Sequence, residues 1–270
     1  MAASGRWNRR TARWCAPRTP TRGRSWRGSV PGGAVAELPG ARLASSGLRH
    51  PQFNGADLFG PALVDPGAVA AWFAAEGVPW AWRTPPGLVD PPGRLVVAQR
   101  LMAVPAAGLR SAVPPAGVHL ALAGPEDLAD VAAVDVAAFG GDAGRARAWL
   151  GPHLAAGAVR AGVEVGLARA GGRAVGTAYA VRSDGAAGPA VLLAGVGVVP
   201  DARGRGVGAA LSSWLLARAA AAGARLAHLQ PDDERAARVY ARLGFTEVEG
   251  LEVRAPEDPA GGGSGRGPRG

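Results

Sequence analysis

The most restrictive feature of this sequence is a glycine-rich segment, residues 202–211, which joins a predicted strand to a predicted helix. The apolar run at 190–199 precedes it, and the segment itself places Arg203, Gly206 and Gly208 at fixed spacing. Apolar residues then recur every three or four positions, as on one face of a helix. Glycine lets the backbone approach a ligand closely, and the first N–H groups of a helix have no internal partners. This order of elements therefore predicts a cradle for an anion such as a pyrophosphate.

Three phosphate-binding loops compete for this pattern. A P-loop requires lysine, and the chain contains none. A dinucleotide-binding fingerprint requires a third glycine, but Leu211 stands at that position when it is counted from Gly206. The third pattern, Arg/Gln-x-x-Gly-x-Gly/Ala after a strand, is complete at Arg203, Gly206 and Gly208. In this respect the chain resembles the GNAT family, the Gcn5-related N-acetyltransferases. The alternative is an ordinary turn in a glycine-rich chain.

A second motif follows the glycine loop. Asp232 and Asp233 offer N-caps to a predicted helix, Gly244 would end that helix, and Phe245 would begin a return strand. The apolar side of this helix would consist of Ala236, Val239, Tyr240 and Leu243. A tyrosine-bearing helix that ends in Leu-Gly-Phe is the other recurrent signature of the GNAT family. Two motifs in the family's order make the resemblance specific over the C-terminal half of the chain.

The resemblance implies an α/β fold with a mixed sheet, the GNAT-like acyl-CoA N-acyltransferase fold. It also implies acetyl-CoA as cosubstrate, no metal, and direct attack by an amine of a small molecule or a protein. The family's pyrophosphate contacts would fall on the backbone N–H groups of Arg203, Gly204, Arg205, Gly206, Val207, Gly208 and Ala209. The cofactor arm would pair with the strand around Val198 and Val199.

The resemblance also assigns Tyr240 as the general acid that protonates the departing thiolate, with core packing as the alternative for this aromatic side chain. The family often has Asn at the position of Asp233, where it contacts the cofactor arm. An ionised Asp accepts but cannot donate a hydrogen bond, which puts that contact in doubt. Asp233 is therefore kept only as a weak cofactor-binding candidate.

The base that deprotonates the amine is not identified by any motif. Glu164, Asp135, His153 and His228 are candidates, and each has an ordinary structural role as its alternative. No base is assigned from the sequence.

The charge is unevenly distributed along the chain. All 30 basic residues are arginines, 21 residues are acidic, and the net charge is +9. Eight of the arginines fall within residues 6–27, interleaved with Trp7, Trp14 and Trp26, and the rest of the chain is nearly neutral. Arg and Trp together can bind RNA by stacking and phosphate contact, but the segment lacks periodicity, and disorder is expected. Nucleic acid is not favoured as a partner.

Other compositional features exclude several classes of protein. The single cysteine, Cys15, allows no disulfide within the chain, and no Cys/His cluster has metal spacing. No secretory segment and no long apolar run occur. We therefore expect a cytoplasmic protein without a membrane partner, and a homodimer is left open.

The domain organisation is predicted from shifts in composition. Residues 1–44 are expected to be a disordered leader, 45–104 a small α/β unit, 105–117 a proline-rich linker, and 118–256 the acetyltransferase-like domain. A flexible tail would occupy 257–270. The stretch from Leu48 to Gly55 resembles the start of the N-terminal half of two-part GNAT proteins, so the small unit is either a degenerate half or an unrelated accessory domain.

Two further functions remain as alternatives to the acetyltransferase. The first is a catalytically inactive acetyl-CoA-binding regulatory module, suggested by Asp233 and by the missing base. The second is an arginine-rich RNA-associated protein, suggested by the leader.

Overall fold

The computed structural model describes residues 33–47, 49, 54–62, 64–154, 162–185 and 188–256. The arginine- and tryptophan-rich leader, including Cys15, and the tail at 257–270 lie outside the described residues. The predictions made for them therefore stay predictions.

Eleven strands and five α-helices alternate along the described part of the chain. The strands are β1 (Ala34–Leu38), β2 (Ala41–Ser45), β3 (Gly55–Leu58), β4 (Ala81–Thr84), β5 (Arg94–Pro105), β6 (Val118–Leu122), β7 (Val163–Ala170), β8 (Arg173–Gly185), β9 (Gly188–Val198), β10 (Leu226–Leu229) and β11 (Thr246–Ala255). The helices are α1 (Pro66–Glu76), α2 (Leu128–Phe139), α3 (Ala143–Leu154), α4 (Val207–Ala221) and α5 (Glu234–Arg242).

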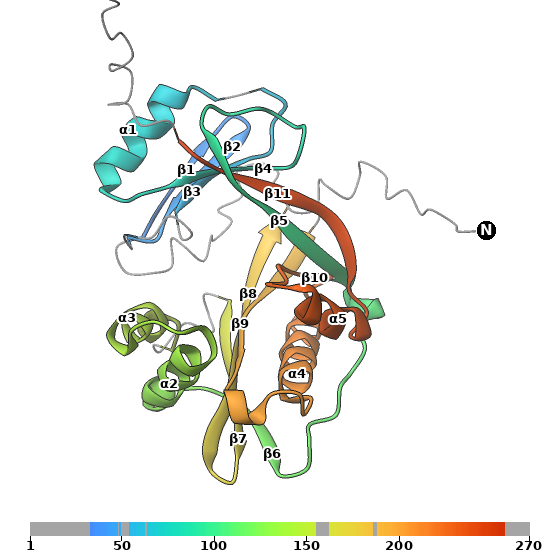
Figure 1. Cartoon of the computed structure of the whole chain (residues 1–270). Coiled ribbons are helices and arrows are strands. Elements are labelled where there is room, and N and C mark those ends of the chain that lie inside the picture. The colour runs from blue at the N-terminus through green and yellow to red at the C-terminus, as the bar shows by residue number, and fades with distance from the viewer. Residues whose placement is uncertain are drawn as a thin grey trace, which may run out of the picture.

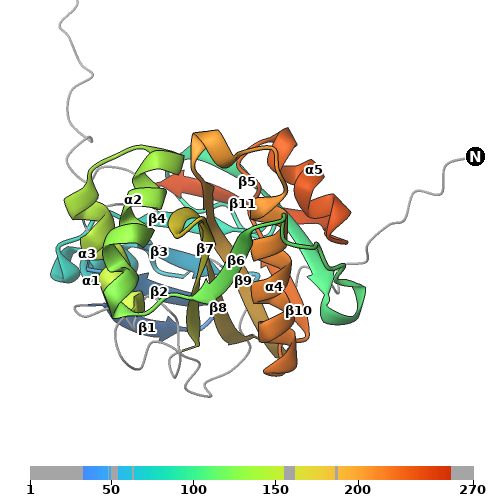
Figure 2. The same cartoon turned by 90° about the horizontal axis from the view of Figure 1, so that it is seen from below.

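All strands belong to one mixed sheet in the order β1-β2-β3-β4-β11-β5-β10-β9-β8-β7-β6. Helices α2 and α3 cover one face of β7–β9 and α4 covers the other, with α5 next to α4 near β10 (Figure 1). Seen from below, the two helical layers again lie on opposite sides of these strands (Figure 2). The predicted mixed α/β fold is confirmed.

The N-terminal lobe consists of β1–β4 and α1 around its own aromatic core. Phe73 and Trp82 are fully buried there, and Trp80 stacks on Phe73 with the ring centroids 4.7 Å apart. Helix α1 begins at an N-cap, Asp65, whose carboxylate accepts a hydrogen bond from the Gly67 amide, and ends at Gly77 with φ 65°.

Strands β1 and β2 correct only the end of the predicted leader, 1–44, because they place residues 34–38 and 41–45 in the sheet. They are short antiparallel strands, and β1 alternates between half-buried and exposed residues. The alternation in Ala-Val-Ala-Glu-Leu is the period-2 pattern of a strand with one covered face. The pattern is weak because the strand is short and its small residues do not stand out in an alanine-rich chain.

The predicted boundary between a small unit and the C-terminal domain divides paired strands. The predicted small unit, 45–104, includes most of β5, yet this strand lies between β10 and β11 and pairs antiparallel with both. β11 also pairs with β4 through residues 252–254. The predicted linker, 105–117, is fixed to the C-terminal domain, since the Arg110 amide donates to the Leu243 carbonyl and the Ala112 amide to Ser213 Oγ.

The C-terminal domain has a core on each face of its sheet. The larger core lies under α4 and α5 and includes Leu211, Leu215 and Phe245, while the smaller lies under α2 and α3 and includes Val131 and Leu150. The predicted helical spacing after the glycine loop is confirmed, because Val207, Leu211 and Leu215 are buried on one face of α4. No helix within the described ranges is long and apolar enough to cross a bilayer.

Candidate active site at the divergence of two parallel strands

The candidate site lies where β9 and β10 separate. These parallel strands pair only through residues 190–192 of β9 and 226–228 of β10. β9 then continues to Val198, while β10 ends at Leu229 and leads into α5. The edge of β9 from Leu193 to Val198 therefore has no strand beside it on the β10 side. Such an edge presents unpaired N–H and C=O groups to a ligand.

A β-bulge bends β9 within this open segment. Thr177 pairs with Gly197 and Tyr179 with Ala194, so Gly195 and Val196 together oppose Ala178 alone. Gly195 has a φ of 57°, and a Cβ there would lie 2.0 Å from Cε1 of Tyr179. Only glycine therefore fits beneath the Tyr179 ring. The bulge turns the last residues of β9 away from β10.

The glycine loop follows β9 and supplies unengaged backbone amides. The consecutive amides from Gly204 to Ala209 donate no hydrogen bond to any residue that the structure describes. Gly204 and Gly206 have φ values of 77° and 88°, and a Cβ at either position would meet no atom within 4 Å. The loop is therefore open, and its N–H groups precede the positive end of the α4 dipole. A diphosphate fits this donor set.

The structure narrows the set of predicted cofactor contacts. The Arg203 amide donates to the Pro200 carbonyl in a tight turn, and the Val199 amide donates to Val175 of β8. Those two amides are engaged. Because backbone groups alternate sides along a strand, Val196 and Val198 are the residues whose groups face the open edge. Val196 was missed from the sequence; the glycines inside the predicted strand were the available signal of a bulge.

The Arg203 side chain joins three elements of the site. Its Nε donates to the Val198 carbonyl at 2.9 Å, and its Nη2 donates to the Ala138 carbonyl at 3.0 Å. Ala138 and Phe139 also pack on Gly197, where a Cβ would lie 2.8 Å from the Ala138 Cβ. Arg203 thereby holds the C-terminal end of α2 against the end of β9 and the start of the loop.

Tyr240 lies on α5, directly after β10. Burial, with a smaller contribution from Asp232, raises the pKa of its phenol to about 12. The ring packs edge-on against Phe245 with the centroids 5.9 Å apart, and the hydroxyl has no hydrogen-bond partner among the described residues. Tyr240 is therefore a neutral phenol at physiological pH, with a proton available to a ligand.

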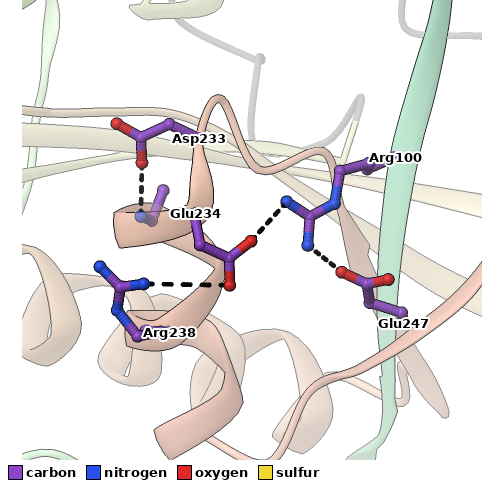
Figure 3. Close-up of polar contacts among 6 residues, drawn as sticks. Arg100, Asp233, Glu234, Arg238 and Glu247 are labelled. Atoms are coloured by element: carbon purple, nitrogen blue, oxygen red, sulfur yellow. Dashed lines mark hydrogen bonds and ion pairs between the residues drawn. The ribbon is translucent and has the colours of Figure 1, made fainter.

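Asp233 serves as the N-cap of α5. Its Oδ1 accepts from the Ala236 amide at 2.7 Å (Figure 3), as predicted for this position. Next to it, Glu234 accepts from Arg100 of β5 at 3.0 Å, and the same guanidinium bonds to Glu247 of β11 (Figure 3). The carboxylates raise the pKa of Arg100, through Glu247 first. This network fixes the start of the tyrosine helix to two strands.

The four candidate bases lie in different environments. Glu164 pairs with Arg218 of α4 at 3.2 Å, and its side chain is 12% exposed. It therefore lies on the opposite face from α2 and already has a partner. His228 keeps a little exposed surface, but burial lowers the pKa of its imidazole to about 4. Asp135 on α2 is half-buried, and burial raises its pKa. The His153 side chain lies outside the described residues.

Comparisons with known proteins identify the C-terminal domain. Residues 141–245 match the family model described as the acetyltransferase (GNAT) family. No curated protein matches the chain in sequence.

Solved structures share the fold. One is a GCN5-related N-acetyltransferase from Kribbella flavida, with a TM-score of 0.64 and 23% identity over 84% of this chain and 91% of that one. Another is a conserved protein of unknown function from Staphylococcus epidermidis, with a TM-score of 0.57 and 15% identity over 83% and 94%. Both extend beyond the family match, so the N-terminal lobe belongs to the shared fold. Residues 141–245 thus match the acetyltransferase (GNAT) family in sequence, and the chain shares its fold with these two proteins.

Proposed function

We propose that this protein transfers an acetyl group from acetyl-CoA to an amine by direct attack. One observation carries the proposal: the run of unengaged amides from Gly204 to Ala209 begins where the open edge of β9 ends. A diphosphate and a peptide-like arm that are covalently joined would need these two features side by side. The family match supports acyl transfer as the class of reaction.

The proposed roles follow from the geometry. The Gly204–Ala209 amides hold the diphosphate, and the open edge at Val196 and Val198 pairs with the arm. Arg203 keeps that edge and the loop in register through its bonds to Val198 and Ala138. The Tyr240 hydroxyl donates a hydrogen bond to the sulfur as it leaves. Asp233 caps the helix that carries Tyr240 and so acts on the site only indirectly.

Acetyl-CoA binding tests the proposal through the loop. We expect calorimetry to show saturable binding of acetyl-CoA. When amines are added, we also expect the enzyme to release free thiol. Gly206→Ala should weaken the binding about tenfold, because φ 88° disfavours a residue with Cβ and a shifted loop misaligns its amides. The strain itself is about 1 kcal/mol.

Gly223→Ala is the matched control. Gly223 follows α4 at its other end with φ 98°, and a Cβ there also meets no atom within 4 Å. This variant should lose similar stability yet keep the affinity. Equal affinities for all three proteins would contradict the assigned loop. Binding without thiol release across a broad amine panel would favour the inactive regulatory module.

A further inference from the structure

Helix α2 carries an ionisable side chain on its buried side. Val131 and Val134 are buried on this face, and Ala138 packs on Gly197 of β9. Asp135 lies one turn after Val131 and three residues before Ala138. With 3.6 residues per turn, Asp135 falls between Val131 and Ala132, which is also buried, on the surface of the helix. The carboxylate therefore lies on the buried side of α2, which packs against β8, β9 and α3.

Asp135 differs from its acidic neighbours in having no partner among the residues that the structure describes. Asp127 and Asp130 both pair with Arg169, at 2.8 Å and 2.6 Å. Asp135 makes no hydrogen bond or ion pair with a described residue, and burial raises its pKa. A half-buried carboxylate without a partner is unfavourable by itself. Its position on the buried side of α2 suits a cationic ligand.

The surroundings place this carboxylate beside the end of β9. Arg203 ties the last turn of α2 to Val198, and Asp135 lies one turn before that contact. Strand β9 has no titratable side chain between Gly188 and Val198. From β8, Tyr179 packs against the core under α2 and α3. No described side chain of β8, β9 or α3, the elements that pack against α2, pairs with Asp135.

We propose that Asp135 binds the protonated amino group of the acceptor, and that the acceptor is a small cationic alkylamine approaching the end of β9 from the side of α2. This rests on the proposed function. The ammonium group first loses a proton to solvent. Its nitrogen then forms a C–N bond to the acetyl carbon as the C–S bond breaks. The nitrogen releases its second proton to give the neutral amide, and the sulfur leaves with the electron pair of the C–S bond and takes up a proton. Asp135 positions the amine and forms no covalent bond.

Kinetics and direct binding test this role with n-butylamine as the probe. In Asp135→Asn we expect the KM for n-butylamine to rise about 10- to 100-fold, as expected for loss of a charge-assisted hydrogen bond. The kcat at saturating amine and the Kd for acetyl-CoA should change less than threefold. Asp135→Glu should recover part of the loss because it restores the charge.

The control is Asp130→Asn on the same helix, which removes a carboxylate already paired with Arg169. It should leave the KM for n-butylamine unchanged. Calorimetry with n-butylamine in the absence of turnover gives an independent readout: the wild type should bind it, and Asp135→Asn should bind it at least tenfold more weakly.

The outcomes separate the two proposals. Equal KM and equal butylamine affinity in the wild type and Asp135→Asn would overturn the role of Asp135, while acetyl transfer by the wild type would still support the proposed function. Loss of acetyl-CoA binding and of turnover in the wild type would reject the proposed function. The butylamine titration would then still decide whether Asp135 binds a cation.

Discussion

Tyr240 stands at the tyrosine position of the helix motif, and its phenol is a weaker acid than an ordinary tyrosine. A phenol whose pKa is raised to about 12 is a weaker acid than a thiol, whose pKa is about 8.5. Complete transfer of its proton to the departing thiolate is therefore unfavourable at equilibrium. The neutral phenol instead suits a hydrogen-bond donor that stabilises the developing negative charge, with the proton finally supplied by solvent.

Tyr240→Phe tests this role at the scale of one atom. We expect kcat to fall about 10- to 100-fold, the range for a lost hydrogen bond to a charged group, and the Kd for acetyl-CoA to stay the same. Because the phenol remains protonated below its raised pKa, the wild-type kcat should show no alkaline decline from Tyr240 up to about pH 10. If Tyr240→Phe turned over at the wild-type rate, the hydroxyl would have no role in turnover and Tyr240 would serve only in packing.

At the scale of elements, the site depends on how α5 is held at its start. The N-cap Asp233 and the Arg100–Glu234–Glu247 network act on the same turn, from the chain itself and from β5 and β11. The network residues are exposed, so their pairs contribute little to stability. They orient the helix, and the cap stabilises it.

Asp233→Ala should lower the free energy of unfolding by about 1 kcal/mol, the usual value of an N-cap. For a chain of this size that corresponds to a fall in Tm of about 2–4 °C. Asp233→Asn keeps an oxygen acceptor and should retain the wild-type Tm in the same thermal scan. If Asp233→Ala unfolds like the wild type, the Ala236 contact does not cap the helix.

The elements around the two motifs could be predicted from the sequence because their signals are local. The apolar spacing of α4, the cap Asp233 and the terminating Gly244, with φ 100°, all lie within a few residues of the structure they determine. The unengaged amides followed from the same local glycine pattern.

Non-local features could not be predicted. The Glu164–Arg218 pair joins β7 to α4, and Arg203 reaches Ala138 of α2. The pairing of β11 with β5 is equally remote, and nothing in either strand specifies its partner. The division into separate units failed for this reason, because composition marks segments but carries no information about which strands meet.

For the whole molecule, β5 is the strand on which the acetyltransferase-like domain depends. It lies between β10 and β11 and supplies backbone partners to both. Without it, β10 loses one neighbour and β11 loses its long antiparallel partner. The N-terminal segment therefore completes the C-terminal domain.

Two fragments test this dependence. The fragment 118–256 should show no cooperative thermal transition by circular dichroism, because its sheet ends at β10 and β11 is unpaired. The fragment 94–256 regains β5 and should unfold cooperatively, at a lower Tm than the whole chain. A native-like transition in 118–256 would show that β5 is dispensable.

The placement of β11 also sets the order of events during synthesis. Residues 252–254 bridge β4 to the rest of the sheet, and β11 is translated after every other strand. Until it leaves the ribosome, β4 has an open edge and no strand joins it to β5 in the sheet. The growing chain thus carries exposed edge strands through most of translation, which makes it a natural client for chaperones that shield such edges.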